Sequence, residues 1–250
     1  MFKNQKKIWI TGASSGIGKA VAEKFASEGW KVAVSARRKE ILEEMAANDN
    51  IFSFPLDVTN SSEINRVFKE ILNQFEDLDI CLFSSGTYDP KNEKSIDSEK
   101  IKNVINVNFF GVVDSVKSVE DFFKERKSGH ISIVSSIAGY RGLPNSSGYG
   151  PSKAALTNFT ESIYFDFKKH NVRVSLISPG FIKTPLTDKN EFSMPFLKTS
   201  SYAAEKIYLG LIKSNSFEVH FPKQLTLTLK FLRILPYKLY LFLVDKLVKR

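Results

Sequence analysis

Cysteine and histidine are scarce in this sequence. Cys81 is the single cysteine among 250 residues, so an intrachain disulfide and a cysteine-rich metal site are both excluded. Cys81 lies in the apolar run 80–83, which indicates a small buried side chain rather than a nucleophile. The three histidines, His130, His170 and His220, lack the spacing of a metal site. We therefore expect no metal and assign the histidines structural or surface roles.

Long apolar runs are also missing. No stretch reaches the roughly 20 apolar residues that span a bilayer, and no apolar core of a signal peptide precedes the first expected strand. Low-complexity tracts and solenoid-length repeats are absent as well. With one cysteine, the chain suits a reducing compartment, and we expect a cytoplasmic location.

What the sequence has instead is a globular composition, 42% hydrophobic, in a chain long enough for one substantial domain. Short apolar runs alternate with segments whose apolar residues recur about every 3.6 positions. This alternation predicts βαβ units and hence an α/β fold, a doubly wound parallel sheet with helices on both faces. The expected strands are 7–11, 31–35, 51–56, 79–83, 130–135 and 172–178, with 216–221 as a candidate seventh. The expected helices are 17–28, 39–47, 61–75, 97–125 and 149–170.

A glycine-rich turn follows the first expected strand. Glycines let the backbone approach a pyrophosphate, and the helix that follows offers free N–H groups and a partial positive charge. The spacing G-x-x-x-G-x-G is a modest signal by itself, and a tight turn without a ligand is the alternative. The stretch reads Thr11-Gly12-Ala13-Ser14-Ser15-Gly16-Ile17-Gly18.

Tyr149 and Lys153 stand four positions apart at the start of an expected helix, in "YGPSK", so their side chains share one face. Pro151 is tolerated in the first turn, where its missing N–H would have no intrahelical partner. An ammonium favours the phenolate, so we expect Lys153 to lower the pKa of Tyr149 from its usual value of about 10. The phenol could then give a proton to a carbonyl oxygen or take one from an alcohol.

Together, the glycine spacing and "YGPSK" resemble the short-chain dehydrogenase/reductase family, over residues 7 to about 220. The resemblance implies a Rossmann-type fold and hydride transfer between a nicotinamide and a carbonyl or secondary alcohol. In the family an active serine stands thirteen residues before the tyrosine, which is Ser136 here, with Ser135 as the alternative. The family asparagine of N-x-x-G, which holds a water of the proton relay, corresponds to Asn108, with Asn106 nearby. The implied catalytic set is Asn108, Ser136, Tyr149 and Lys153.

The end of the second expected strand bears on the choice of cofactor. Ser35-Ala36-Arg37-Arg38 contains no carboxylate for the ribose 2′-OH of NAD. Two guanidiniums stand instead where a 2′-phosphate would lie, and arginine binds phosphate with two parallel hydrogen bonds. We therefore expect NADP(H) rather than NAD(H), the alternative being two solvated arginines that begin a helix.

The family resemblance implies further cofactor contacts. Asp57, which precedes Val58, stands where an aspartate of the family bonds the adenine amino group. The alternative is an aspartate that only forms a turn. Gly86 ends "FSSG", where the family usually has Asn-Asn-Ala-Gly, so close backbone approach remains while the asparagine side chains are gone. Pro179-Gly180 begins a turn in which Ile182 and Thr184 would contact the nicotinamide amide and phosphate. The alternative is a turn without any cofactor contact. The implied cofactor-binding set is Gly12, Ser14, Ser15, Gly16, Ile17, Gly18, Arg37, Arg38, Asp57, Val58, Gly86, Tyr149, Lys153, Pro179, Gly180, Ile182 and Thr184.

A substrate lid is expected at about 186–200, where the family has one. The segment mixes polar residues with Phe192, Met194, Phe196 and Leu197, which suggests an apolar substrate. The alternative is a lid that packs on a core of its own.

The C-terminal tail, residues 221–250, departs from a minimal family member. It has seven lysines and arginines against one aspartate, about +6 of the chain's formal +9. Pro236 divides it into two expected short helices, and Lys238, Asp245, Lys246 and Lys249 fall on one side of the second. This pattern favours a basic amphipathic helix pair on an anionic membrane surface. A tail docked on the body or on a second subunit is the alternative.

These inferences predict an NADP-binding catalytic domain over 1–220, followed by the basic tail of 221–250. The leading function is NADP(H)-dependent reduction of a hydrophobic, lipid-like or steroid-like ketone or aldehyde, and thus a dehydrogenase acting on CH–OH groups. An NAD-linked alcohol dehydrogenase, or an idle dinucleotide-binding sensor or scaffold at the membrane, is the alternative. Family members are often dimers or tetramers, so we expect a homodimer or homotetramer. No basic patch accompanies a recognition motif, which argues against a nucleic acid partner.

Overall fold

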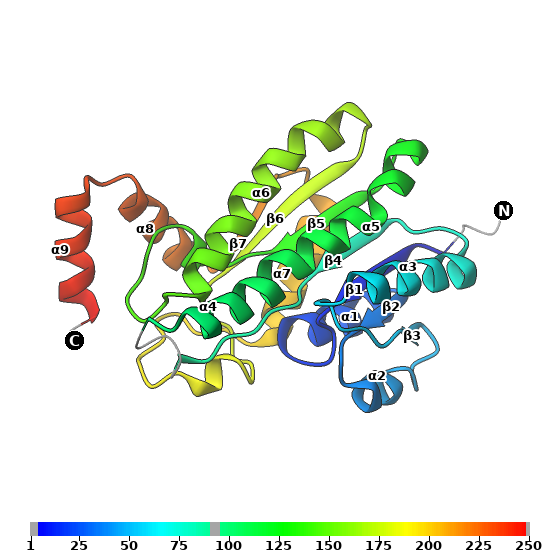
Figure 1. Ribbon diagram of the computed structural model, residues 1–250, viewed down its shortest axis with the longest axis horizontal. Helices are drawn as coiled ribbons and strands as arrows, with labels where there is room; N and C mark the ends of the chain where they lie inside the picture. The colour runs from blue at the N-terminus through cyan, green and yellow to red at the C-terminus, as the bar shows by residue number, and fades with distance from the viewer. Residues whose placement is uncertain (1–4, 91–95, 249–250) are drawn as a thin grey trace.

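The computed structural model describes residues 5–90 and 96–248. Seven parallel strands form one sheet in the order β3-β2-β1-β4-β5-β6-β7, with helices against both faces (Figure 1). The predicted doubly wound α/β fold is thereby confirmed, and the candidate seventh strand is a parallel edge strand. The strands are β1 Lys7–Thr11, β2 Lys31–Ser35, β3 Ile51–Ser53, β4 Ile80–Phe83, β5 His130–Val134, β6 Arg173–Pro179 and β7 Glu218–Phe221.

The helices follow the strands in alternation. The N-terminal half has α1 Gly16–Ser27, α2 Lys39–Met45 and α3 Ser61–Phe75. The middle of the chain has α4 Ser98–Ile105, a π-helical turn Asn106–Phe110, α5 Gly111–Arg126 and α6 Tyr149–Lys169. The C-terminal part has α7 Ser200–Lys213, α8 Lys223–Arg233 and α9 Tyr237–Val248.

Alternate residues of each strand point to opposite faces of the sheet and belong to two separate hydrophobic cores. Ile8 and Ile10 of β1 pack with α1 and α7 on one face, whereas Trp9 packs with α3, α5 and α6 on the other. A side chain pointing to either face of a parallel sheet is covered by a helix, which explains why the strands read as continuous apolar runs. Cys81 is one of these buried strand residues, as predicted.

Three elements differ from the sequence prediction. The strand expected over 51–56 ends at Ser53, because Pro55 has no N–H to donate, although Phe54 and Leu56 still donate to Val34 and Ala36 of the neighbouring chain segment. The helix expected over 97–125 is interrupted by the π-helical turn Asn106–Phe110. Helix α7 was not predicted.

The tail forms the two predicted helices at the end of the molecule opposite the N-terminus (Figure 1). Helix α8 buries Leu225, Thr226 and Leu232, and α9 buries Tyr240 and Val244. The opposite side is exposed and largely apolar. The exposed apolar residues are Leu227, Phe231, Ile234, Tyr237, Leu239, Leu241 and Phe242.

Charged residues flank this apolar side. Lys238, Asp245 and Lys246 are exposed, while Lys249 lies outside the described residues. No helix in the described ranges is long and apolar enough to cross a membrane. The tail is therefore attached to the body along one side and leaves an amphipathic surface on the other.

Candidate active site

The glycine-rich turn after β1 has the backbone that only glycine adopts easily. Gly12 has φ +69°, and a Cβ there would lie 2.7 Å from the carbonyl oxygen of Ser84. A Cβ on Gly18 would lie 2.4 Å from the carbonyl oxygen of Gly12, so α1 packs directly on the turn. The N-terminus of α1 thus opens into a cleft at the carboxyl ends of β1 and β4, where the strand order reverses.

This cleft has a volume of about 660 Å³, and most of the predicted cofactor residues line it. It is bounded by the glycine-rich turn, the ends of β2, β4 and β5, and the segment after β6. The predicted residues in its lining are Gly12, Ser14, Ser15, Gly16, Ile17, Gly18, Arg37, Arg38, Asp57, Val58, Gly86, Tyr149, Lys153, Pro179 and Thr184.

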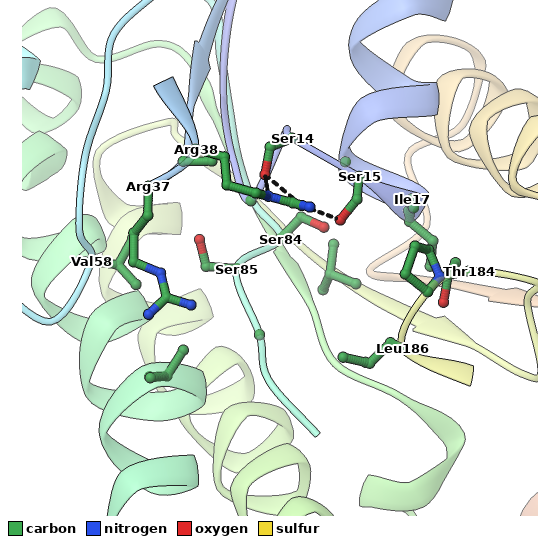
Figure 2. A pocket seen from close by; sticks show the side chains of 18 of the residues that line it. Ser14, Ser15, Ile17, Arg37, Arg38, Val58, Ser84, Ser85, Thr184 and Leu186 are labelled. Atoms are coloured by element: carbon green, nitrogen blue, oxygen red, sulfur yellow. Dashed lines mark hydrogen bonds between the residues drawn. The ribbon is translucent and has the colours of Figure 1, made fainter. Parts of the chain in front are cut away.

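The two arginines occupy different places in the cleft (Figure 2). The Arg38 guanidinium donates to the hydroxyl of Ser14 at 2.8 and 3.1 Å and to that of Ser15 at 2.8 Å, and so braces the turn. Arg37 points away from that turn, toward Val58, and has no hydrogen bond or ion pair among residues 5–90 and 96–248. All donors of the Arg37 guanidinium are thus free of the described residues and open to an anionic ligand, whereas Arg38 uses its Nε and Nη2 on the two serines.

Asp57 and Val58 line the wall next to Arg37. The Asp57 carboxylate accepts from the backbone N–H of Thr59 at 3.0 Å and from its hydroxyl at 2.8 Å. These bonds form the turn that was the predicted alternative to adenine binding by Asp57. Asp57 nevertheless also lines the cleft. A carboxylate has further acceptor sites, so the two roles are compatible.

Tyr149 is the first residue of α6 and lines the cleft. Burial raises its pKa to about 12, against a lowering contribution from its hydrogen bond with Ser136. The sequence-based expectation of a pKa lowered by Lys153 is therefore wrong for this environment, because desolvation of the phenolate exceeds the effect of nearby groups. The phenol stays protonated at neutral pH.

The two candidate serines have separate roles. The Ser136 hydroxyl faces Tyr149 and also accepts from the backbone N–H of Ala138 at 3.1 Å. The Ser135 hydroxyl donates to the carbonyl oxygen of Lys153 at 2.8 Å and lies 3.0 Å from the Thr157 hydroxyl, so it is bonded within the fold although Ser135 also lines the cleft. Ser136 is accordingly the serine beside the phenol, and Ser135 has the strand-end role that was its alternative.

Lys153 is buried one turn after Tyr149. Its ammonium donates to the carbonyl oxygen of Val134 at 2.9 Å and lies 5.7 Å from the centre of the Tyr149 ring. Burial lowers the pKa of Lys153 to about 8. The lysine therefore changes charge close to physiological pH, within reach of the phenol.

Asn108 lies in the π-helical turn and is fully buried, whereas Asn106 is exposed. Its amide oxygen accepts from the backbone N–H of Thr87 at 2.7 Å, and its amide nitrogen donates to the carbonyl oxygen of Thr87 and to the Ser152 hydroxyl, both at 3.0 Å. Asn108 thus ties the segment after β4 to α6. A Cβ on Gly86 would lie 3.6 Å from the Asn108 amide oxygen and 3.7 Å from the Lys153 ammonium, so Gly86 lies directly beside both side chains.

The segment after β6 contributes unevenly. Pro179 and Thr184 line the cleft, and Thr184 lies 3.1 Å from a Cβ built on Gly16. Ile182 is buried in the core, and Gly180 packs against Leu225 of α8. Gly180 and the side chain of Ile182 are thus outside the cleft lining, so only their backbone groups could serve a cofactor.

The expected lid of 186–200 contains a short 3₁₀ turn, Thr187–Lys189. Its apolar residues Phe192, Phe196 and Leu197 are 48%, 51% and 40% exposed, so they do not form a core of their own. Leu186 and Lys189 are the members that line the cleft.

Several residues of the site were missed by sequence reasoning. Ser84 and Ser85 line the cleft (Figure 2), and Ser152 joins Asn108 to the Tyr149 carbonyl oxygen, at 2.7 Å from the latter. Tyr88 places its ring 4.9 Å from that of Tyr149, as one wall of the site. The sequence signal that could have identified Ser152 was its position directly before Lys153. No local sequence pattern marks Tyr88.

The described residues of the cleft fit a dinucleotide. The positive φ of Gly12 and Gly16, the bare backbone at the start of α1 and the guanidinium of Arg37 suit phosphate groups. No group of three or more histidine, cysteine or acidic side chains in the described ranges could hold a metal ion. His130 instead bonds Ser175 at 2.7 Å in the sheet, and His220 bonds Thr226 at 2.7 Å.

Comparison with known proteins identifies the family of this chain. The family model described as short chain dehydrogenase matches residues 6–194. An uncharacterised oxidoreductase of Myxococcus xanthus is 34% identical over 236 residues, covering 92% of this chain and 93% of the relative. Carbonyl reductase family member 4 of Xenopus tropicalis is 34% identical over 179 residues, covering 71% of this chain and 76% of the relative. The chain belongs to the short-chain dehydrogenase family, and it is an oxidoreductase of that family.

Solved structures share the fold. ElxO with NADP bound has a TM-score of 0.76 at 25% identity, covering 86% of this chain and 97% of the other. Other structures of this fold, below 25% identity, include complexes with NAD as well as NADP. A nicotinamide cofactor follows from the family, whereas the fold alone does not decide between the two.

Proposed function

We propose that this protein is an NADP(H)-dependent carbonyl reductase that acts on a hydrophobic ketone or aldehyde. The observation that carries the proposal is the buried phenol of Tyr149, hydrogen-bonded to Ser136 and one turn from Lys153, in the lining of the dinucleotide cleft. The catalytic domain would be 1–220, with the tail of 221–250 as an attached element.

The four predicted catalytic residues have complementary roles in this proposal. The nicotinamide, when bound, supplies the hydride to the carbonyl carbon. Tyr149 donates its proton to the carbonyl oxygen, and Ser136 holds that oxygen by a hydrogen bond. Lys153 stabilises the phenolate that forms and would hold the ribose hydroxyls, while Asn108 positions the segment around Gly86. With its pKa raised to about 12, the phenol of Tyr149 is protonated at neutral pH, so the proton that reduction needs is present.

The preference for NADP(H) rests on Arg37. Its guanidinium lines the cleft at the end of β2 with no carboxylate beside it in the sequence 35–38, and its donors are unused by the described residues. A 2′-phosphate is the anion that matches this position. Arg38 would support the same phosphate indirectly, because it holds the hydroxyls of Ser14 and Ser15.

The hydrophobic nature of the substrate is inferred from two surfaces. The lid exposes Phe192, Phe196 and Leu197, and the tail exposes a row of apolar side chains among basic ones. We propose that the tail contacts an anionic membrane surface and that the substrate is lipid-like or steroid-like. An idle dinucleotide-binding sensor is the second candidate.

The test is NADPH oxidation at 340 nm with ketones and aldehydes of increasing chain length. We expect turnover that rises with apolar length and falls by at least about 10²-fold in Tyr149→Phe, because the variant keeps the ring but loses the proton. Tyr164→Phe, a tyrosine of the same helix that packs on Phe217, is the matched control and should keep full activity.

Two results would contradict the proposal. Equal turnover by Tyr149→Phe would remove the phenol from the chemistry. NADPH binding without turnover of any carbonyl by the unaltered protein would favour the idle sensor.

A further inference from the structure

The segment between Ser136 and Tyr149 is held in place by the C-terminal tail. Ile137 and Tyr140 pack with Leu225 of α8 and with its neighbour Leu229. This segment joins the serine and the tyrosine of the proposed active site, so whatever holds it also holds both ends of that pair.

Arg141 is the main link. Its Nη1 lies 3.2, 3.1 and 2.7 Å from the carbonyl oxygens of Leu232, Arg233 and Leu235, at the end of α8. A guanidinium there hydrogen-bonds carbonyl oxygens at the end of the helix and interacts favourably with the negative end of the helix dipole. The same guanidinium lies 4.6 Å from the ring centre of Tyr237 and 4.0 Å from that of Tyr240, in α9. One side chain therefore holds both tail helices.

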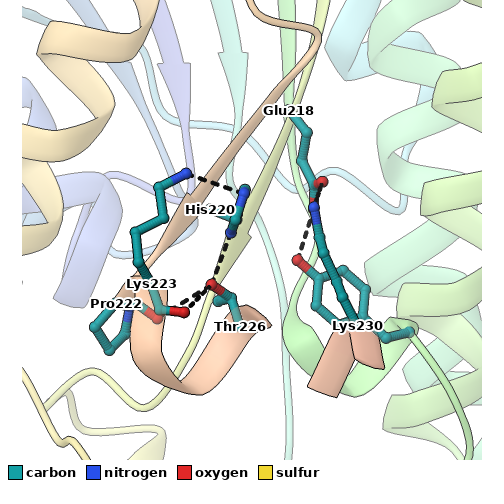
Figure 3. Close-up of polar contacts among 7 residues, drawn as sticks. Glu218, His220, Pro222, Lys223, Thr226 and Lys230 are labelled. Atoms are coloured by element: carbon teal, nitrogen blue, oxygen red, sulfur yellow. Dashed lines mark hydrogen bonds and ion pairs between the residues drawn. The ribbon is translucent and has the colours of Figure 1, made fainter. Parts of the chain in front are cut away.

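The residues on either side of Arg141 are tied as well. The Tyr140 hydroxyl donates to Glu218 of β7 at 2.6 Å, and the Glu218 carboxylate also accepts from Lys230 of α8 (Figure 3). The Tyr240 hydroxyl of α9 donates to the carbonyl oxygen of Gly142 at 2.7 Å. Tyr140, Arg141 and Gly142 thus each contact β7 or the tail. The start of α8 is joined to the same strand through His220 of β7, which bonds both Lys223 and Thr226 (Figure 3).

The inner side of the segment touches the proposed catalytic residues. A Cβ on Gly139 would lie 2.7 Å from the carbonyl oxygen of Lys153, so the segment packs against the first turn of α6. Ser136 caps the 3₁₀ turn Ile137–Gly139 by accepting from Ala138. A shift of the segment would therefore move Ser136 relative to Tyr149 and Lys153.

We propose that Arg141 is a positioning residue, through which the C-terminal tail sets the geometry of Ser136 and Tyr149. The inference rests on the proposed function, because it concerns the same phenol and hydroxyl. The glycine-rich turn and Arg37 lie outside the contacts of Arg141, so replacing Arg141 should affect catalysis more than cofactor affinity.

The test compares Arg141→Met and Arg141→Lys with the unaltered full-length chain. Arg66→Met is the matched control, since Arg66 is exposed on α3 and pairs only with Glu70 among the described residues. The measurements are kcat and KM for a carbonyl substrate, the Kd for NADPH by fluorescence, the Tm, and amide hydrogen exchange of peptides covering 137–148 and 12–18.

In Arg141→Met we expect kcat to fall about tenfold or more, since small displacements of reacting groups are costly to rate. The Kd for NADPH should stay within about twofold of that of the unaltered chain. Amide hydrogen exchange should become faster in 137–148 and not in 12–18. Arg141→Lys should retain part of the rate because it keeps the charge. Arg66→Met should match the unaltered chain.

An unchanged kcat with a lowered Tm would overturn the inference, because Arg141 would then only anchor the tail. If the unaltered protein turns over no carbonyl, the proposed function fails by itself and the exchange data decide this inference. Faster exchange confined to 137–148 would then support it, and unchanged exchange would overturn it.

Discussion

Burial decides the chemistry of the individual residues at this site. Tyr149 and Lys153 form the pair that the sequence predicts, yet desolvation raises the pKa of the tyrosine to about 12 and lowers that of the lysine to about 8. Both shifts favour the neutral form, because each charged form loses hydration. The apoprotein therefore holds a protonated phenol, suited to donate a proton.

Arg37 allows the sharpest residue-scale prediction. Arg37→Asp should weaken NADPH binding by about tenfold or more, because a charge-assisted hydrogen bond is replaced by repulsion of the 2′-phosphate. NADH binding should improve at the same time, since a carboxylate at this place can accept from the ribose 2′-OH. The measurement is the ratio of kcat/KM for NADPH to that for NADH.

Arg37→Gln is the control for this change. It removes the charge without adding a carboxylate, so it should weaken NADPH binding and leave NADH binding near its original value. An unchanged cofactor ratio in Arg37→Asp would contradict the assignment of NADP(H).

At the scale of elements, the π-helical turn Asn106–Phe110 shapes the site. Its residues read as part of one continuous helix, because an apolar spacing near 3.6 does not reveal a single widened turn. The turn buries Asn108 and leaves Asn106 exposed. It also brings Gly111, the first residue of α5, against Val58 in the wall of the cleft.

Gly111→Ala tests this packing. Alanine stabilises an exposed helix position relative to glycine by about 1 kcal/mol, but a Cβ here would lie 2.9 Å from both a side-chain carbon and the carbonyl oxygen of Val58. We expect the free energy of unfolding to fall by about 1–3 kcal/mol, as in an overpacked core, together with weaker NADPH binding. Denaturant unfolding and NADPH titration measure the two effects.

Lys117→Ala, an exposed substitution in the same helix, should change the free energy of unfolding by at most about 0.5 kcal/mol. A more stable Gly111→Ala protein would show that α5 can move away from Val58.

At the scale of the whole molecule, the exposed side of the tail is the surface available for contact with a membrane or a second subunit. Its attached side is explained by β7 and the 137–142 segment, whereas Phe231, Leu241 and Phe242 on the other side are 61%, 60% and 54% exposed. Apolar side chains among lysines fit an anionic interface. The homodimer or homotetramer expected from the family stays a prediction.

The full-length protein should therefore bind phosphatidylserine vesicles and not neutral ones. Binding should weaken as salt is raised, because basic residues near an anionic surface contribute about 1 kcal/mol each and are screened. Phe231→Ser combined with Phe242→Ser should reduce binding by at least about tenfold, from lost apolar contact. Vesicle sedimentation measures the bound fraction.

Phe165→Ser is the matched control, since Phe165 is 66% exposed on α6, outside the tail. Equal binding by the tail double variant and the unaltered protein would contradict membrane contact. A change in oligomeric state in place of vesicle binding would indicate a second subunit on this surface.

The sequence by itself determined the alternation of strands and helices, the glycine-rich turn and the arginines at the end of β2, and its family resemblance predicted the catalytic set around Tyr149. These features are readable because periodicity, turn chemistry and motif spacing are properties of neighbouring residues. The tertiary structure decided which of Ser135 and Ser136 faces the phenol, the directions of the pKa shifts, and the attachment of the tail through Arg141. Those depend on burial and on contacts between residues about 90 positions apart, which no local pattern encodes.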